Sequence, residues 1–111
     1  LADITTPPSR RSLTPEVLIN TVANYFHLTL EALQGKRRDK PIALARQIAM
    51  YLMREETQLP WTEIGRALGG KNHATIMHGY AKVVKEIDDN SVLRRDVLEI
   101  REQLYNKIAQ G

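Results

Sequence analysis

Apolar residues recur along the chain at intervals of three and four, which is the period of an α-helix with one buried face. The first such segment opens with Thr14-Pro15-Glu16, which supplies a capping hydroxyl, a proline in the first turn and an acid near the positive helix end. Leu18, Val22 and Phe26 follow at helical spacing. We therefore expect a first helix over residues 15–26.

Two more segments precede the middle of the chain. Thr29 is placed to cap a short turn that runs through Leu33 and ends at Gly35. The basic loop, residues 36–40, then leads to Pro41. After it, a continuous apolar stripe predicts a long, well-buried helix to about residue 56, formed by Ile42, Ala45, Ile48, Ala49, Leu52 and Met53.

A glycine turn joins two helical segments over residues 62–87. Pro60 stops the long helix, and a short helix carrying Ile64 and Leu68 ends at Gly69-Gly70, which suit the left-handed backbone of a tight turn. This pattern fits a plain helical hairpin and equally a helix-turn-helix, whose second helix enters the major groove of DNA. The apolar inner face of that second helix is expected to comprise Ile76, Tyr80, Val83, Val84 and Ile87.

The last segment predicts one more amphipathic helix, and it completes the expected fold. Residues 88–91 interrupt the pattern, after which apolar residues recur at Leu93, Val97, Ile100, Leu104 and Ile108. The sequence contains no strand pattern and no internal repeat. We therefore expect an all-α, compact bundle of about six helices with a TrpR-like helix-turn-helix over residues 14–111. Residues 1–13 have no such period, and we expect a linker from the end of an upstream domain.

Charge is distributed unevenly along the chain. The net charge is +3, but residues 35–85 hold ten Lys and Arg against four acids, a net +6. Such a segment is typical of a protein that binds a polyanion. The absence of cysteine excludes disulfides, thiolate metal sites and thiol nucleophiles, and is compatible with a reducing cytoplasm.

Several residues invite other interpretations. His73 and His78 are five residues apart, about 140° around a helix, with no nearby carboxylate, so we expect no metal site. The sequence carries no nucleophile–base motif, so we expect no enzyme. Core or hinge packing is expected for Trp61 and Tyr80 rather than base stacking. Residues 14–26 are amphipathic, but packing on the core is preferred over membrane-surface association.

The run from Gly69 to Gly79, GGKNHATIMHG, resembles the signature of the C-terminal DNA-binding domain of the bacterial replication initiator family, DnaA. The basic loop, the segment 43–50 and Glu63-Ile64-Gly65 occur in the family's order. The resemblance implies binding of one monomer to each short, asymmetric box of double-stranded origin DNA, in the bacterial cytoplasm and nucleoid. It also implies a preceding AAA+ domain that binds ATP and Mg, no cofactor in this segment, and contacts with acidic phospholipids and replication regulators.

The resemblance also assigns roles to individual residues. Base contacts are expected from Arg38 in the minor groove and from Asn72, His73 and Ala74 in the major groove. Asn72 stands where the family usually has Asp, and it both accepts and donates hydrogen bonds, so we expect looser discrimination there. Ala74 stands where Thr is usual and lacks its hydroxyl. Phosphate or flanking contacts are expected from Lys36, Arg37, Arg46, Gln47, Arg54, Thr62, Lys71, Thr75, His78 and Lys82.

Two other hypotheses stay open. The chain is alternatively a helical protein-interaction module whose last helix recruits a replication regulator, and an exposed apolar stripe over residues 93–108 would favour it. The third hypothesis is a DnaA-like DNA-binding domain of a transcription or transposition protein. Only sequence upstream of this chain separates that hypothesis from the first.

Overall fold

The computed structural model describes residues 13–110, with side chains up to residue 107, and the helices of this range are joined by turns and loops with no strand among them. No helix in it is long and apolar enough to cross a membrane. The predicted all-α fold is confirmed. Of the predicted linker only Leu13 is described, and it is buried in the core. The helices are α2 (Pro15–Tyr25), α3 (Leu30–Gln34), α4 (Lys40–Thr57), α5 (Trp61–Ala67), α6 (His73–Glu86) and α7 (Ser91–Gln110).

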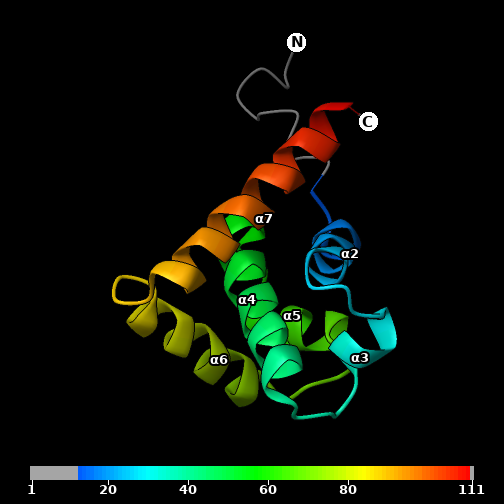
Figure 1. The fold of residues 1–111 in the computed structure, drawn as a ribbon. Helices are drawn as coiled ribbons and strands as arrows, with labels where there is room; N and C mark the ends of the chain where they lie inside the picture. The colour runs from blue at the N-terminus through cyan, green and yellow to red at the C-terminus, as the bar shows by residue number, and fades with distance from the viewer. Residues whose placement is uncertain (1–12, 111) are drawn as a thin grey trace.

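Helix α4 is the centre of the bundle and contacts each of the other five helices (Figure 1). Pro41 lies in its first turn, where the missing amide hydrogen costs no helical hydrogen bond. The helix ends where Gln58 adopts a left-handed conformation with φ 57°, and the Gln58 N–H donates to the Arg54 carbonyl at 3.0 Å. Ile48 and Leu52 are fully buried on its apolar stripe. The predicted long buried helix is therefore confirmed.

Helices α2 and α3 begin at the threonines that the sequence indicates. Thr14 Oγ1 accepts a hydrogen bond from the Val17 amide at 3.2 Å, and Thr29 Oγ1 accepts one from the Ala32 amide at 3.0 Å. Gly35 ends α3, but with φ −82° it does not use the left-handed conformation of a glycine cap. The terminal carbonyls of this short helix are satisfied by side chains from elsewhere in the fold.

Helix α7 packs on the bundle with one apolar face. Asn90 Oδ1 accepts a hydrogen bond from the Leu93 amide at 3.0 Å, and the predicted stripe is buried from Leu93 to Leu104. The Ile108 side chain lies outside the described residues. Val92 and Leu98 are exposed, but they are six residues apart and therefore point about 120° away from each other around the helix. The exposed stripe that would favour an interaction module is thus absent from the described part of α7.

One predicted core residue is exposed. Val84 of α6 was expected on the inner face, but 45% of its surface is accessible, whereas Ile76 and Val83 are buried. The reason is that α6 packs mainly on α4 and α5, which cover a narrow face, and adjacent positions point about 100° apart. The far end of α7 lies at the opposite end of the molecule from the basic loop, which connects α3 to α4 (Figure 1).

Candidate nucleic-acid interface

The turn between α5 and α6 depends on closely packed glycines. The Gly65 carbonyl accepts hydrogen bonds from the amides of Gly70 and Lys71, both at 2.9 Å. Gly69 and Gly70 have φ values of 89° and 84°, which favour glycine. A Cβ on Gly69 would also lie 2.1 Å from the Gln34 carbonyl oxygen. The helix-turn-helix is therefore confirmed, and its turn lies directly against the end of α3.

A further glycine lies where α6 packs closely against α4. A Cβ on Gly79 would lie 2.3 Å from Met50 Sδ, closer than non-bonded atoms approach. Gly79 itself is buried, and Ile76 beside it is fully buried against the core. The helix face opposite the polar face of α6 is therefore closely packed against the core.

The N-terminal end of α6 is exposed and carries no acid in its first turn. Asn72 caps it, because its Oδ1 accepts a hydrogen bond from the Ala74 amide at 2.7 Å. His73, Ala74 and Thr75 are all exposed. Asn72 Nδ2 donates to no acceptor among the described residues, so a free donor stands at the positive end of the helix dipole.

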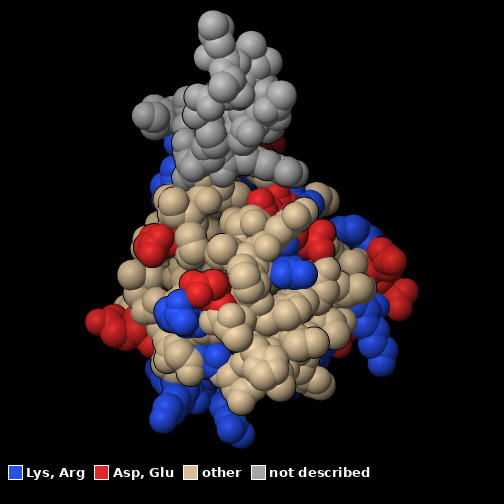
Figure 2. All heavy atoms as spheres, turned by 180° about the vertical axis from the view of Figure 1, so that it is seen from behind, with Lys and Arg blue, Asp and Glu red and all other residues tan. Residues whose placement is uncertain are grey.

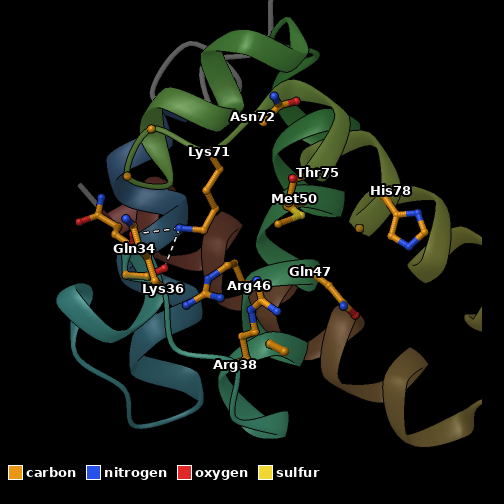
Figure 3. A pocket seen from close by; sticks show the side chains of 15 residues that line it. Gln34, Lys36, Arg38, Arg46, Gln47, Met50, Lys71, Asn72, Thr75 and His78 are labelled. Atoms are coloured by element: carbon orange, nitrogen blue, oxygen red, sulfur yellow. Dashed lines mark hydrogen bonds between the residues drawn. The ribbon is translucent and has the colours of Figure 1, made fainter.

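A groove of about 540 Å³ runs between the basic loop, α4 and α6 (Figure 3). It brings together residues that are far apart in the sequence, and most of its polar side chains were predicted as site residues. Gln34 and Met50 also line it and were not predicted. The predicted residues in the groove are Lys36, Arg38, Arg46, Gln47, Lys71, Asn72, Thr75 and His78.

Two cations of this groove are occupied by contacts within the protein. Lys71 Nζ donates hydrogen bonds to the carbonyls of Gln34, Gly35 and Leu68 at 2.8–2.9 Å, two of which Figure 3 shows. Burial lowers the pKa of Lys71, and the charges of Arg46 and Lys36 lower it further. Arg46 is only 8% exposed, and burial lowers its pKa too.

The Arg46 guanidinium donates to three carbonyls, those of Leu33, Arg37 and Ala32, at 2.7, 2.8 and 2.9 Å. The sequence carries no signal for this role, because the carbonyls of Leu33 and Ala32 are 13 and 14 residues away and have no side-chain signature. Phosphate contact by Arg46 and Lys71 stays a prediction.

Other cations near the groove are free to meet a ligand. Lys36, Arg38 and Lys82 are exposed and form no ion pair within the described part of the chain. Arg37 pairs with Asp39 at 2.6 Å, but the pair is exposed and therefore weak. From behind, Lys and Arg side chains project from the lower end of the molecule, where the basic loop lies (Figure 2). This end of the molecule is suited to a polyanion.

Six predicted contact residues do not line the groove: Arg37, Arg54, Thr62, His73, Ala74 and Lys82. Arg54 stacks over the Trp61 ring at 4.4 Å and donates to the Leu59 carbonyl at 2.7 Å, which ties the end of α4 to α5. Thr62 is exposed near the start of α5. Trp61 and Tyr80 pack edge-to-face at 5.2 Å between their ring centroids, which confirms the expected packing role of both rings.

The histidines of α6 do not gather into a metal site. No group of three or more His, Cys, Asp or Glu side chains within the described range is arranged to hold a metal ion. His73 and His78 are instead exposed on the polar face of α6. Both side chains are therefore accessible for hydrogen bonding at the surface.

Known proteins match this chain over most of its length. The chromosomal replication initiator protein DnaA of Thermomicrobium roseum is 46% identical over 96 residues, which cover 86% of this chain and 21% of that protein. The DnaA of Roseiflexus castenholzii is 41% identical over 106 residues, covering 96% and 22%. The DnaA of Lacticaseibacillus casei is 42% identical over 95 residues, covering 86% and 21%. The chain therefore spans about a fifth of the length of these relatives.

A family model described as the bacterial DnaA protein helix-turn-helix matches residues 15–83, from the start of α2 to near the end of α6. That range contains the basic loop, the glycine turn and the groove. The chain belongs to the family of bacterial DnaA helix-turn-helix domains.

Proposed function

We propose that residues 14–111 are a domain that binds double-stranded DNA at origin boxes of the DnaA type, with one monomer on each box. The first turn of α6 enters the major groove, and the basic loop enters the adjacent minor groove. The observation that carries this proposal is the groove itself, because it places Arg38 of the loop and Asn72 of α6 on the same side of α4.

The chemistry of the exposed end of α6 supports direct reading of bases. His73 and Asn72 present hydrogen-bonding groups, and Ala74 presents a methyl group suited to the methyl of thymine. Arg38 supplies a cation for the narrow, electronegative minor groove. These four residues are the proposed base contacts.

The groove walls are suited to the sugar–phosphate backbone. Gln47, Thr75 and His78 each present a hydrogen-bond donor there, and contacts of this kind fix the register of a protein on DNA. Exposed lysines at each side, Lys36 and Lys82, add charge that attracts phosphate. Arg37, Arg54 and Thr62 remain proposed flanking contacts, and none of the three lines the groove.

In a longer protein, the domain would act beside the AAA+ domain implied by the resemblance. That domain would bind ATP and Mg, and the DNA-binding domain would deliver it to a replication origin in the bacterial nucleoid. Acidic phospholipids and replication regulators are further proposed partners. None of these roles requires a cofactor within residues 14–111.

Fluorescence anisotropy tests this function. Labelled duplexes carrying the box TTATNCACA or a scrambled sequence are titrated at two salt concentrations. We expect a preference of at least about tenfold for the box, which corresponds to about 1.4 kcal/mol. Equal, strongly salt-dependent affinity for both duplexes contradicts box reading, and no binding to either contradicts the proposed function.

Two substitutions separate base reading from phosphate contact. His73→Ala is expected to cost about 1–3 kcal/mol of discrimination between box and scrambled DNA. Lys82→Ala is expected to weaken binding to both duplexes alike and to reduce the salt slope by about one. Arg95→Ala on α7 removes an equal charge far along the chain and serves as the control. The same pattern from His73→Ala and Lys82→Ala contradicts the assigned roles.

A further inference from the structure

The end of α3 is held by two side chains that come from other elements. The last carbonyls of a helix have no partner within it, and here Arg46 of α4 and Lys71 of the turn supply the missing donors. Arg46 reaches the carbonyls of Ala32 and Leu33, and Lys71 reaches those of Gln34 and Gly35. Every carbonyl from residue 32 to residue 35 therefore accepts a hydrogen bond from one of these two cations.

Each cation also donates to a carbonyl outside α3, and that carbonyl shows which element the cation joins to α3. Arg46 donates to the Arg37 carbonyl, inside the basic loop. Lys71 donates to the Leu68 carbonyl, at the end of α5. Positive charge is favourable at the C-terminal ends of helices, and the Lys71 ammonium lies at two such ends at once. One ammonium therefore links the start of the basic loop to the helix-turn-helix.

The same junction contains two more contacts. Gln34 Nε2 donates to the Ala67 carbonyl at 2.9 Å, and the Gln34 carbonyl oxygen lies 2.1 Å from the position that a Cβ on Gly69 would take. The end of α3 is thus in direct contact with the turn that precedes α6. We call this set of contacts, made by Gln34, Gly69 and Lys71, the loop–turn junction.

An ammonium has three N–H donors, and all three of Lys71 have protein acceptors. A phosphate contact would require Lys71 to withdraw its hydrogen bond from one of these partly buried carbonyls. Lys82, which lies on α6, is exposed and donates no hydrogen bond to a backbone carbonyl within the described residues. Lys71 is therefore a structural cation at a place where the sequence alone indicates a DNA contact.

We propose that Lys71 is a positioning residue that fixes the basic loop relative to α6, so that Arg38 and the first turn of α6 are presented at the spacing of adjacent DNA grooves. The effect on DNA binding rests on the proposed function, whereas the positioning of the basic loop by Lys71 does not. Loss of the junction would leave both DNA-reading elements intact and let their separation vary.

A distance measurement tests the structural part without DNA. The chain has no cysteine, so Lys36→Cys and Ala81→Cys introduce unique sites for two spin labels, one at the basic loop and one on the exposed side of α6. Electron–electron double resonance is expected to give one narrow distance distribution in the parent and a broader one after Lys71→Met. Lys82→Met, which removes the same charge from α6, is expected to leave the distribution narrow. An unchanged distribution after Lys71→Met overturns the proposal.

Loss of folding is separated from loss of positioning by a milder variant. Circular dichroism first identifies a temperature at which every variant is folded. Gln34→Met removes only the side-chain hydrogen bond to Ala67. It is expected to broaden the distance distribution, but less than Lys71→Met does. If neither Gln34→Met nor Lys71→Met broadens it while both remain folded, the junction does not position the loop.

A double-mutant cycle tests the consequence for DNA. Lys71→Met is expected to weaken box binding about tenfold when Arg38 is present and less than about threefold in the Arg38→Ala background. In that background the loop already lacks the side chain whose position Lys71 is proposed to fix. Lys82→Met should cost the same in both backgrounds. Additive losses for Lys71→Met, with a salt slope reduced by about one, would make it a phosphate contact and overturn the proposal. If the parent binds no duplex, the proposed function fails, while the spin-label result still decides the junction.

Discussion

Helices α6 and α7 are built alike and face their surroundings differently. Each begins at an asparagine whose side-chain oxygen accepts a hydrogen bond from an amide in the first turn, and each buries an aliphatic face. On α6 no acid occurs before Glu86. On α7 acids and bases alternate, and Arg95 lies 3.7 Å from Asp96 and 3.9 Å from Glu99.

The difference shows that amphipathic spacing identifies an inner face but not the use of the outer one. Two cations of α7 are engaged by other parts of the protein, since Arg101 pairs with Glu56 of α4 at 2.8 Å and Arg94 donates to carbonyls at the end of α6. Lys36, Arg38 and Lys82, which are exposed near α6, form no ion pair with any described residue. Unpaired charge around a packed helix end, rather than amphipathicity, distinguishes the helix proposed to bind DNA.

The largest expected effect tests what the two helices share. Ile76 and Ile100 are both fully buried, one in each helix. Ile76→Ala and Ile100→Ala are each expected to lower the free energy of unfolding by about 2–5 kcal/mol, because each leaves a cavity in the same core. Urea denaturation followed by circular dichroism measures both. A loss below about 1 kcal/mol at one site would mean that the two inner faces are not equivalent.

A second substitution sharpens the difference between the two capping asparagines. Asn72→Asp keeps the oxygen that caps α6 but removes the Nδ2 donor, so it should leave stability nearly unchanged. At the base opposite residue 72, it is expected to shift preference towards cytosine, whose amino group donates, by about 1–3 kcal/mol. Anisotropy with boxes varied at each base in turn measures this shift.

The matched change on α7, Asn90→Asp, keeps that helix cap and should leave base preference unaltered. Asn72→Ala completes the set, because it loses the cap and the donor together and should cost about 1 kcal/mol of stability. If Asn72→Asp and Asn90→Asp have the same effect on base preference, Asn72 does not read a base.

The smallest expected effect concerns the tyrosines that fasten each helix. The hydrogen bond to Glu55, followed by burial, raises the pKa of Tyr80 on α6 to about 12. Burial, followed by the hydrogen bond to Asp96 of α7, raises the pKa of Tyr25 to about 12 as well. Because the folded protein favours the neutral phenols, their contribution is complete below pH 10 and is lost as the pH rises from 10 towards 12.

Urea midpoints at several alkaline pH values test this. Tyr25→Phe and Tyr80→Phe should each flatten the decline above pH 10, and the double variant should flatten it most. A decline that is as steep in the double variant as in the parent would assign the alkaline loss of stability to other groups.

Much of the fold could be predicted from the sequence, because local chemistry determines it. Thr14, Thr29 and Pro41 mark helix starts through their own side chains, and Gly69-Gly70 marks the tight turn between α5 and α6. Val84 was wrongly placed because its burial depends on which helices cover α6, and periodicity does not contain that information.

The candidate site was predictable only in part, for a related reason. The exposed first turn of α6 follows from the residues themselves, and the groove contains most of the side chains that the resemblance assigns. The roles of Lys71 and Arg46 depend on backbone carbonyls that lie far away in sequence. A lysine in a basic segment has the same appearance in a sequence whether its donors face solvent or are occupied by the protein.

The course of α7 has a practical consequence for single-molecule work. This helix carries the chain from the end of α6 to the end of the molecule farthest from the basic loop (Figure 1). A biotin handle or fluorescent protein joined after α7 would therefore stand on the side away from the proposed duplex. Molecules immobilised through that handle should present their groove to free oligonucleotides, so residence times on individual boxes become measurable without interference from the surface.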